Sequence, residues 1–188
     1  DGIRGEIVLG EQRIDVRSVR DAIGHGIYLV PEDRRGTGLV TEMTVLENIT
    51  LPSLPAHSAL GVIRRGRERE TAVRQKDSLN IKTPSVDALV VNLSGGNQQK
   101  VVLGKWLAMS PKVMIFDEPT RGIDVGAKAE IYRLMRDLAA AGTVVIMISS
   151  DMEEILHVSD RVAVMHEGEI TGVLKRADST EENIMQLA

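Results

Sequence analysis

The chain has 188 residues, a hydrophobic fraction of 43% and a net charge of -4, which is the balance of a globular domain and excludes a disordered chain. It has no cysteine, so disulfides, thiolate catalysis and cysteine-ligated zinc are excluded. A pI near 5.6 argues against a nucleic-acid surface, and no stretch approaches the roughly 20 apolar residues of a membrane span.

The first fifty residues predict short elements separated by turns. In chain order these are a β-hairpin over 6–9 and 12–14, a helix over 18–23, a strand over 27–30, a polar loop over 32–38 and a helix over 44–51. Gly10 and Glu11 supply the hairpin turn. Thr44 and Glu47 have the spacing of a capping box, which marks the start of the last helix.

The segment from 63 to 79 is strongly charged and has few apolar positions. Its arginines could form a patch for phosphate or nucleic acid. The alternative is a solvated helix in which Glu and Arg interleave, and the mixed signs of charge favour that helix.

The second half predicts alternating helices and strands. In chain order these are a helix over 98–109, a strand over 113–116, a helix over 127–141, a strand over 143–148 and a β-hairpin over 161–165 and 170–174. The strand over 113–116 and the run Val144–Ile148 are wholly apolar, which indicates strands buried in a parallel sheet. This alternation predicts an α/β fold. The four histidines are too scattered to suggest a metal site.

Two adjacent acids, Asp117 and Glu118, follow the apolar strand over 113–116. In open α/β sheets, ligands bind at the carboxyl ends of the strands. Asp117 could hold Mg²⁺ there through water, and Glu118 could orient or deprotonate an attacking water. The alternative is a strand that simply ends in polar residues.

Ser94, Gly95 and Gly96 lie where a helix is predicted to start. Unpaired backbone N–H groups and the helix dipole favour an anion at such a place, and glycine lets a phosphate approach closely. The alternative is an ordinary N-cap preceded by a turn.

Together, LSGGNQQK over 93–100 and VMIFDEPTRGID over 113–124 resemble the signature motif and the Walker B strand of ATP-binding cassette (ABC) ATPases, the second continuing into the D-loop. The resemblance covers essentially the whole chain. It implies one domain, 1–188, with a partial ABC-ATPase fold of the P-loop NTPase type. That fold has a parallel core sheet, flanking β-hairpins and a helical subdomain over about 44–110.

The resemblance also implies roles for individual residues and the cofactors ATP and Mg²⁺. Glu118 would be the catalytic residue and Asp117 the metal ligand. The nucleotide-binding residues would be Ser94, Gly95, Gly96, Asn97, Gln98, Glu32, Asp124 and Ser150. In the family, the signature closes over the γ-phosphate of ATP held by a partner domain. A second cassette is therefore expected, either in tandem or in a dimer.

Variant residues narrow the resemblance to one branch of the family. Asn97 replaces a more common Gln, Pro31–Arg35 replaces the usual Q-loop, and Ser150 stands where most ABC proteins have His. This combination resembles the C-terminal cassette of bacterial monosaccharide importers of the ribose, galactose and xylose type. It implies transmembrane sugar permease subunits and, indirectly, a periplasmic sugar-binding protein as partners, with no nucleic acid. The expected location is peripheral, on the cytoplasmic side of the inner membrane.

Two departures and one missing motif bear on activity. Glu32 adds a negative charge where a Gln would contact Mg²⁺ and water, and Ser150 carries no positive charge at any pH, unlike His. No G-x-x-x-x-G-K-[ST] phosphate loop occurs in the chain. In the family this loop would lie shortly before Asp1. We therefore expect that the loop was removed with a preceding segment and that the chain alone is inactive.

Two alternatives to an active importer ATPase stay open. A soluble ABC protein could act on ribosomes or DNA, although DNA-repair members need a long heptad insert and ribosome-acting members usually carry basic linkers. The second is a non-catalytic half that does no more than supply its signature to a partner, which is compatible with an importer and is the form that Glu32 and Ser150 favour. For coupling to a permease, the segment from Gly38 through Leu39, Val40 and Met43 to Leu46 could dock a helix of the membrane subunit or could be core.

Overall fold

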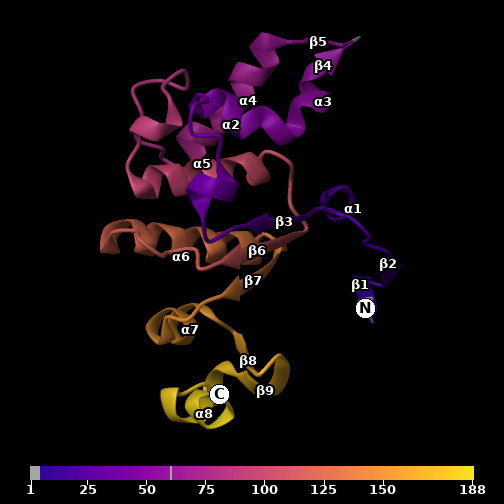
Figure 1. Cartoon of the computed structure of the whole chain (residues 1–188), viewed down its shortest axis with the longest axis vertical. Coiled ribbons are helices and arrows are strands. Elements are labelled where there is room, and N and C mark those ends of the chain that lie inside the picture. Colours follow the sequence, from indigo (N-terminus) through magenta and orange to yellow (C-terminus); the bar gives the residue numbers. More distant parts are fainter. Residues whose placement is uncertain (1–4, 60) are drawn as a thin grey trace.

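The computed structural model describes residues 5–59 and 61–188, and it is built around a parallel sheet. The three strands are β3 (Ile27–Val30), β6 (Val113–Asp117) and β7 (Val144–Ile148), in the order β3–β6–β7. Figure 1 shows this sheet between a group of helices and the C-terminal hairpin. The predicted α/β fold with a parallel sheet is confirmed.

One aliphatic core joins the sheet to the helices. Val30 of β3 and Met114 and Phe116 of β6 are fully buried. They belong to one cluster with residues of helices α5 (Gly95–Leu107) and α6 (Val125–Ala140). Side chains two residues apart on a strand lie on the same face, so Met114 and Phe116 enter this core together. Their burial holds the end of β6 in place, and Asp117 and Glu118 with it.

β7 departs from the buried strand that the sequence predicts. Val144, Ile146 and Ile148 are 52%, 47% and 51% exposed, while Val145 and Met147 pack against the core. Among the described residues β7 pairs with β6 alone, so it is an edge strand, and the face that carries Val144, Ile146 and Ile148 is about half exposed. An apolar run fits a half-covered strand as well as a buried one, so the run alone could not decide between them.

The helical part consists of α2 (Val45–Thr50), α4 (Arg65–Ser78) and α5, which contact one another. The predicted capping box is confirmed, because the Thr44 hydroxyl accepts from the Glu47 amide at 3.1 Å and the Glu47 carboxylate accepts from the Thr44 amide at 2.8 Å. The division of residues 44–110 as a subdomain stays a prediction, and residues 1–4 and Leu60 of the predicted 1–188 domain lie outside the described part.

The charged segment forms helix α4, with a narrow buried stripe and an exposed remainder. Glu68, Thr71 and Ala72 are buried. The Arg69 guanidinium pairs with Asp87 on the exposed side. The interpretation of this segment as a solvated helix is therefore confirmed.

The predicted hairpins and the predicted first helix form at the two ends of the chain, whereas the elements between α2 and α4 and the helices that follow β7 and the C-terminal hairpin are not predicted from the sequence. At the N-terminal end they are β1 (Ile7–Leu9), β2 (Gln12–Ile14) and α1 (Val19–Gly24). Between α2 and α4 lie a 3₁₀ turn (Leu51–Ser53), α3 (Leu54–His57), β4 (Ser58–Ala59) and β5 (Val62–Ile63). At the C-terminal end they are α7 (Met152–Val158), β8 (Arg161–His166), β9 (Glu169–Lys175) and α8 (Glu181–Leu187).

One further feature differs from the sequence prediction, and a second is not predicted from the sequence. The predicted loop over 32–38 contains a π-helical turn, Arg34–Gly38, because the Gly38 amide donates to the Asp33 carbonyl five residues back at 3.2 Å. The Asp33 carboxylate caps this turn by accepting from the amides of Arg35 and Gly36. The C-terminal hairpin and α8 have a small core of their own around Val162, Val164 and Ile184. Within the described ranges, no helix has the length and apolar character needed to cross a membrane.

Candidate functional site

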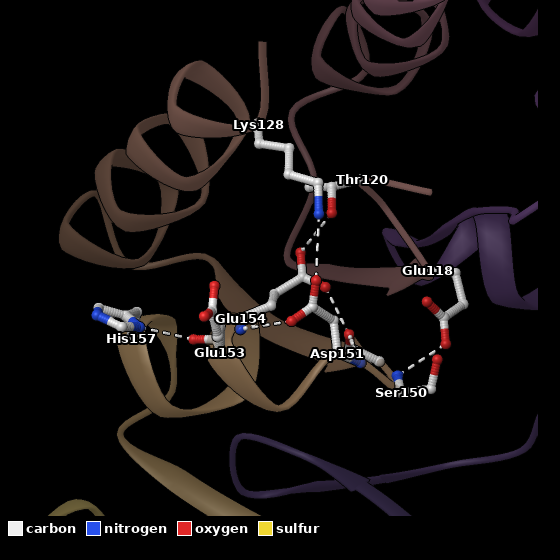
Figure 2. A network of polar contacts seen from close by, with 9 residues as sticks. Glu118, Thr120, Lys128, Ser150, Asp151, Glu153, Glu154 and His157 are labelled. Carbon is white, nitrogen blue, oxygen red and sulfur yellow. Dashed lines mark hydrogen bonds and ion pairs between the residues drawn. The ribbon is translucent and has the colours of Figure 1, made fainter. Parts of the chain in front are cut away.

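The two adjacent acids lie at the carboxyl edge of the sheet, where β6 ends. The Glu118 amide donates to the Ile148 carbonyl of β7 at 2.9 Å. Glu118 has φ +45°, a left-handed conformation that non-glycine residues rarely adopt and that is common at functional sites. Its carboxylate accepts a hydrogen bond from the Ser150 amide at 2.8 Å, as Figure 2 shows. Glu118 and Ser150, both proposed from sequence, are thus in direct contact.

The second group of predicted residues lies at the start of α5. This helix begins at Gly95, earlier than the predicted Gln98, because Ser94 takes the N-cap position with an extended backbone. The Ser94 hydroxyl makes no capping bond and accepts instead from the Asn97 amide group at 2.8 Å. The Asn97 oxygen accepts from the Lys82 backbone amide at 2.8 Å, so its polar atoms already have protein partners.

Gly96 is required where α5 meets α6. A Cβ atom at this position would lie 2.9 Å from the Cβ of Ala127, closer than side-chain carbons approach one another. At Gly95, a Cβ atom would lie 2.7 Å from Nη2 of Arg34. The first N–H groups of a helix have no partner within it. Gly96 therefore lets α6 pack closely against this helix start, whereas a side chain at 95 would displace only the flexible end of Arg34.

Two arginines cross between the segment after β3 and the segment after β6. The Arg34 guanidinium donates to the Arg121 carbonyl at 3.2 Å. The Arg121 guanidinium in turn forms an ion pair with the Glu32 carboxylate. The negative charge of Glu32 is therefore paired with the positive charge of Arg121.

Gln98 has a different place from the one that the sequence suggests. Its side chain is fully buried. Its oxygen accepts from Nε of Arg35 at 3.2 Å, and its amide nitrogen donates to the Val90 carbonyl at 3.1 Å. Both ends of the side chain are thus used inside the protein, so Gln98 anchors the start of α5 and its side chain is not free for a nucleotide.

Asp124 is exposed and caps helix α6. One carboxylate oxygen accepts from the Ala127 amide at 3.0 Å, and the other lies 3.8 Å from where a Cβ of Gly96 would be. The segment from 119 to 124 therefore connects the carboxyl edge of the sheet with the signature residues.

The described residues include no group of three or more His, Cys, Asp or Glu side chains that could hold a metal ion. Mg²⁺ commonly binds through one or two carboxylates together with water and substrate phosphates. The partly exposed Asp117 fits such a site only if a nucleotide supplies further oxygens. The metal role of Asp117 stays a prediction.

Behind the carboxyl edge lies a polar network that sequence reasoning missed (Figure 2). Lys128 of α6 bonds the Asp151 carboxylate at 3.1 Å. This bond lowers the pKa of Asp151 and raises the pKa of Lys128. Buried Glu154 of α7 accepts from the hydroxyls of Thr120 and Ser149. Asp151 and Glu154 have the local spacing of an N-cap and its third helical residue, but the contacts of Thr120 and Lys128 join elements 34 and 23 positions away, which no local pattern marks.

Residues 1–121 match the model of the family described as ABC transporter. The chain belongs to this family. Three curated relatives of this ABC chain are similar over nearly all of it. They are a ribose import ATP-binding protein RbsA of Rhodopirellula baltica, 50% identical, an arabinose import ATP-binding protein AraG of Pseudomonas syringae, 50% identical, and a xylose import ATP-binding protein XylG of Moorella thermoacetica, 52% identical. Each alignment covers 98% of the chain but 36% of the relative, so the chain spans about a third of their length.

Two solved structures share the ABC fold of the chain. A dimeric post-hydrolysis structure of the ATP-binding cassette MJ0796 bound to ADP and Pi has a TM-score of 0.75 at 21% identity, covering 92% of this chain and 74% of that one. The ATP-binding cassette MJ1267 of an ABC transporter has a TM-score of 0.76 at 22% identity, covering 95% and 74%. At this identity the likeness shows the fold alone.

Proposed function

We propose that the chain is part of the ATP-binding and ATP-hydrolysing component of a bacterial monosaccharide importer. The observation that carries the proposal is its identity of 50–52%, over 98% of its length, with relatives named for ribose, arabinose and xylose import. The direct test is ATP hydrolysis by the full-length polypeptide with its permease in lipid vesicles. Hydrolysis stimulated by a pentose and its binding protein supports the proposal, and hydrolysis stimulated by ribosomes or DNA supports the alternative.

In this proposal the chain contributes its signature to ATP held by a second cassette, in tandem or in a dimer. Support comes from the exposed Ser94 at the start of α5 and from the first N–H groups of that helix, which favour a phosphate. Asp117, Glu118 and Ser150 belong to the cassette's own nucleotide site, with ATP and Mg²⁺ as cofactors. The partners are sugar permease subunits and, through them, a periplasmic sugar-binding protein. The location is peripheral, on the cytoplasmic face of the inner membrane.

The 188-residue chain by itself should show no steady ATP hydrolysis and only weak nucleotide binding. Its sequence contains no G-x-x-x-x-G-K-[ST] motif, and Ser150 supplies no cation at the γ-phosphate. The measurement is phosphate release by highly purified chain over a dilution series, with nucleotide binding followed by calorimetry. Turnover that is proportional to chain concentration and is lost in Glu118→Gln would contradict this expectation.

In the full-length protein, Glu118→Gln should reduce transport much less than the equivalent substitution in the partner cassette. A site with Ser150 in place of His, and with Glu32 paired to Arg121, stabilises the negative charge of the transition state poorly. The measurement compares sugar uptake by the two single variants and the double variant. Equal losses from the two single variants would mean that both sites hydrolyse ATP.

The proposed docking surface for the permease needs one correction. Leu39 is only 7% exposed and belongs to the core, so its assignment to a docking surface is wrong. Met43 and Leu46 instead line a half-open cavity of about 400 Å³, whose other apolar lining residues are Leu51, Leu54 and Ile63. Glu47, Arg65, Glu68, Arg69 and Asp87 add charged groups to the lining. This mixture suits one short amphipathic helix of a membrane subunit.

Met43→Asp should uncouple ATP hydrolysis from sugar uptake or prevent assembly with the permease. A carboxylate in the apolar lining opposes docking, and the partly exposed position lets it reach water, so the fold should persist. Met43→Leu, which keeps an apolar side chain of similar volume, is the matched control and should transport normally. The measurements are sugar uptake and copurification of the permease. Normal uptake by Met43→Asp would place the docking surface elsewhere.

A further inference from the structure

Glu154 is a buried acid that the proposed chemistry does not use. Its side chain lies on α7 and is only 2% exposed. Its two carboxylate oxygens are bonded separately: Oε1 accepts from the Thr120 hydroxyl at 3.2 Å, and Oε2 accepts from the Ser149 hydroxyl at 2.5 Å. A carboxylate only accepts hydrogen bonds, so two converging hydroxyl donors match it well.

The two donors come from the segments that leave adjacent strands of the sheet. Thr120 lies just after β6 and Glu118, and Ser149 lies just after β7 and before Ser150. Figure 2 shows Glu154 between these segments. The Ser149 hydroxyl also accepts from the Asp151 amide at 3.0 Å, and Asp151 caps α7 by accepting from the Glu154 amide at 3.3 Å. One side chain thus ties two loops to the start of one helix.

The link reaches both groups of proposed site residues. On one side, the loop after β7 places the Ser150 amide on the Glu118 carboxylate at 2.8 Å. On the other side, the segment after Thr120 leads to Ile123, whose Cγ2 lies 3.7 Å from the Cβ position of Gly96. If Thr120 loses its bond to Glu154, the segment over 119–124 can therefore shift relative to Gly96 and the start of α5.

We propose that Glu154 is a positioning residue that locks the loop carrying Thr120 to the loop carrying Ser149, and so sets the placement of the signature for the partner's ATP. The lock itself follows from the contacts, whereas its effect on turnover rests on the proposed function. Because misplacement by about 1 Å can cost two orders of magnitude in rate, loosening the lock should lower kcat.

The test uses the full-length transporter and two kinds of measurement. Glu154→Ala should speed amide hydrogen exchange in residues 118–124 and 148–151. It should also lower kcat at least about tenfold, while KM for ATP changes less than about threefold. Glu154→Gln should behave nearly as wild type, since an amide can accept from Thr120 and donate to Ser149. Glu153→Ala, at the exposed neighbouring acid, is the matched control and should change neither measurement.

Two milder variants keep the test decisive if Glu154→Ala does not fold. Thr120→Val should speed exchange in 118–124 alone, because it removes one donor to Glu154 and leaves the other. Ser149→Ala should speed exchange in 148–151 alone; it also removes the acceptor of the Asp151 amide, so that amide is left out of the comparison. Unchanged exchange in both variants, or equal damage by Glu154→Gln and Glu154→Ala, would overturn the proposal. Absence of ATP hydrolysis by the wild type would contradict the proposed function instead, while the exchange measurements would still decide the role of Glu154.

Discussion

Ser94→Arg should abolish ATP hydrolysis by the assembled transporter while the chain keeps its fold. Ser94 is exposed, and within the described part its hydroxyl hydrogen-bonds only to the Asn97 side chain, so a long side chain can extend into solvent. There it would fill the space before the first N–H groups of α5, which the proposed function assigns to the partner's phosphate. We expect a loss of at least about a hundredfold in kcat, measured as phosphate release in vesicles.

Ser94→Ala is the control for this experiment, because it removes the hydroxyl without filling the space. It should keep most of the activity, and thermal unfolding of both variants should match the wild type. Gly96→Asp is a less clean probe, since any Cβ at 96 meets Ala127 at 2.9 Å and the fold itself would respond. Retained transport by Ser94→Arg would show that this signature is not used.

Phe116→Ala should destabilise the chain by about 3–5 kcal/mol, which is the usual cost of truncating a buried Phe. Phe116 is fully buried in the middle strand and lies between Val30 of β3 and Met147 of β7 in the register of the sheet. The measurement is urea unfolding, monitored by the fluorescence of Trp106, the single tryptophan. Its ring stacks on the ring of Tyr28, with 5.1 Å between the ring centroids.

Ile146→Ala on β7 is the matched control for the core truncation. Its side chain is 47% exposed, so removing it leaves no closed cavity and should cost about 1 kcal/mol. Similar costs for the two substitutions would mean that the exposed face of β7 is covered in solution.

Signals within a few residues let the sequence by itself determine most of the elements. Thr44 and Glu47 set the start of α2, because a capping box needs only residues three apart. The apolar run over 113–116 predicts β6, because a short continuous apolar run is by itself a signal for a buried strand. The two acids that follow the run predict its polar end. The motifs over 93–100 and 113–124 are also contiguous in sequence, so they indicate the ABC family without the fold.

Tertiary structure alone decided which side chains are free to act. Three contacts show this. Gln98, which is buried, bonds to Arg35 at a separation of 63 positions. Arg121 pairs with Glu32 over 89 positions, and Thr120 bonds to Glu154 over 34 positions. The exposure of β7 likewise depends on which element lies beside it. Such contacts depend on the path of the whole chain in space, and no propensity that acts over a few neighbouring residues carries that information.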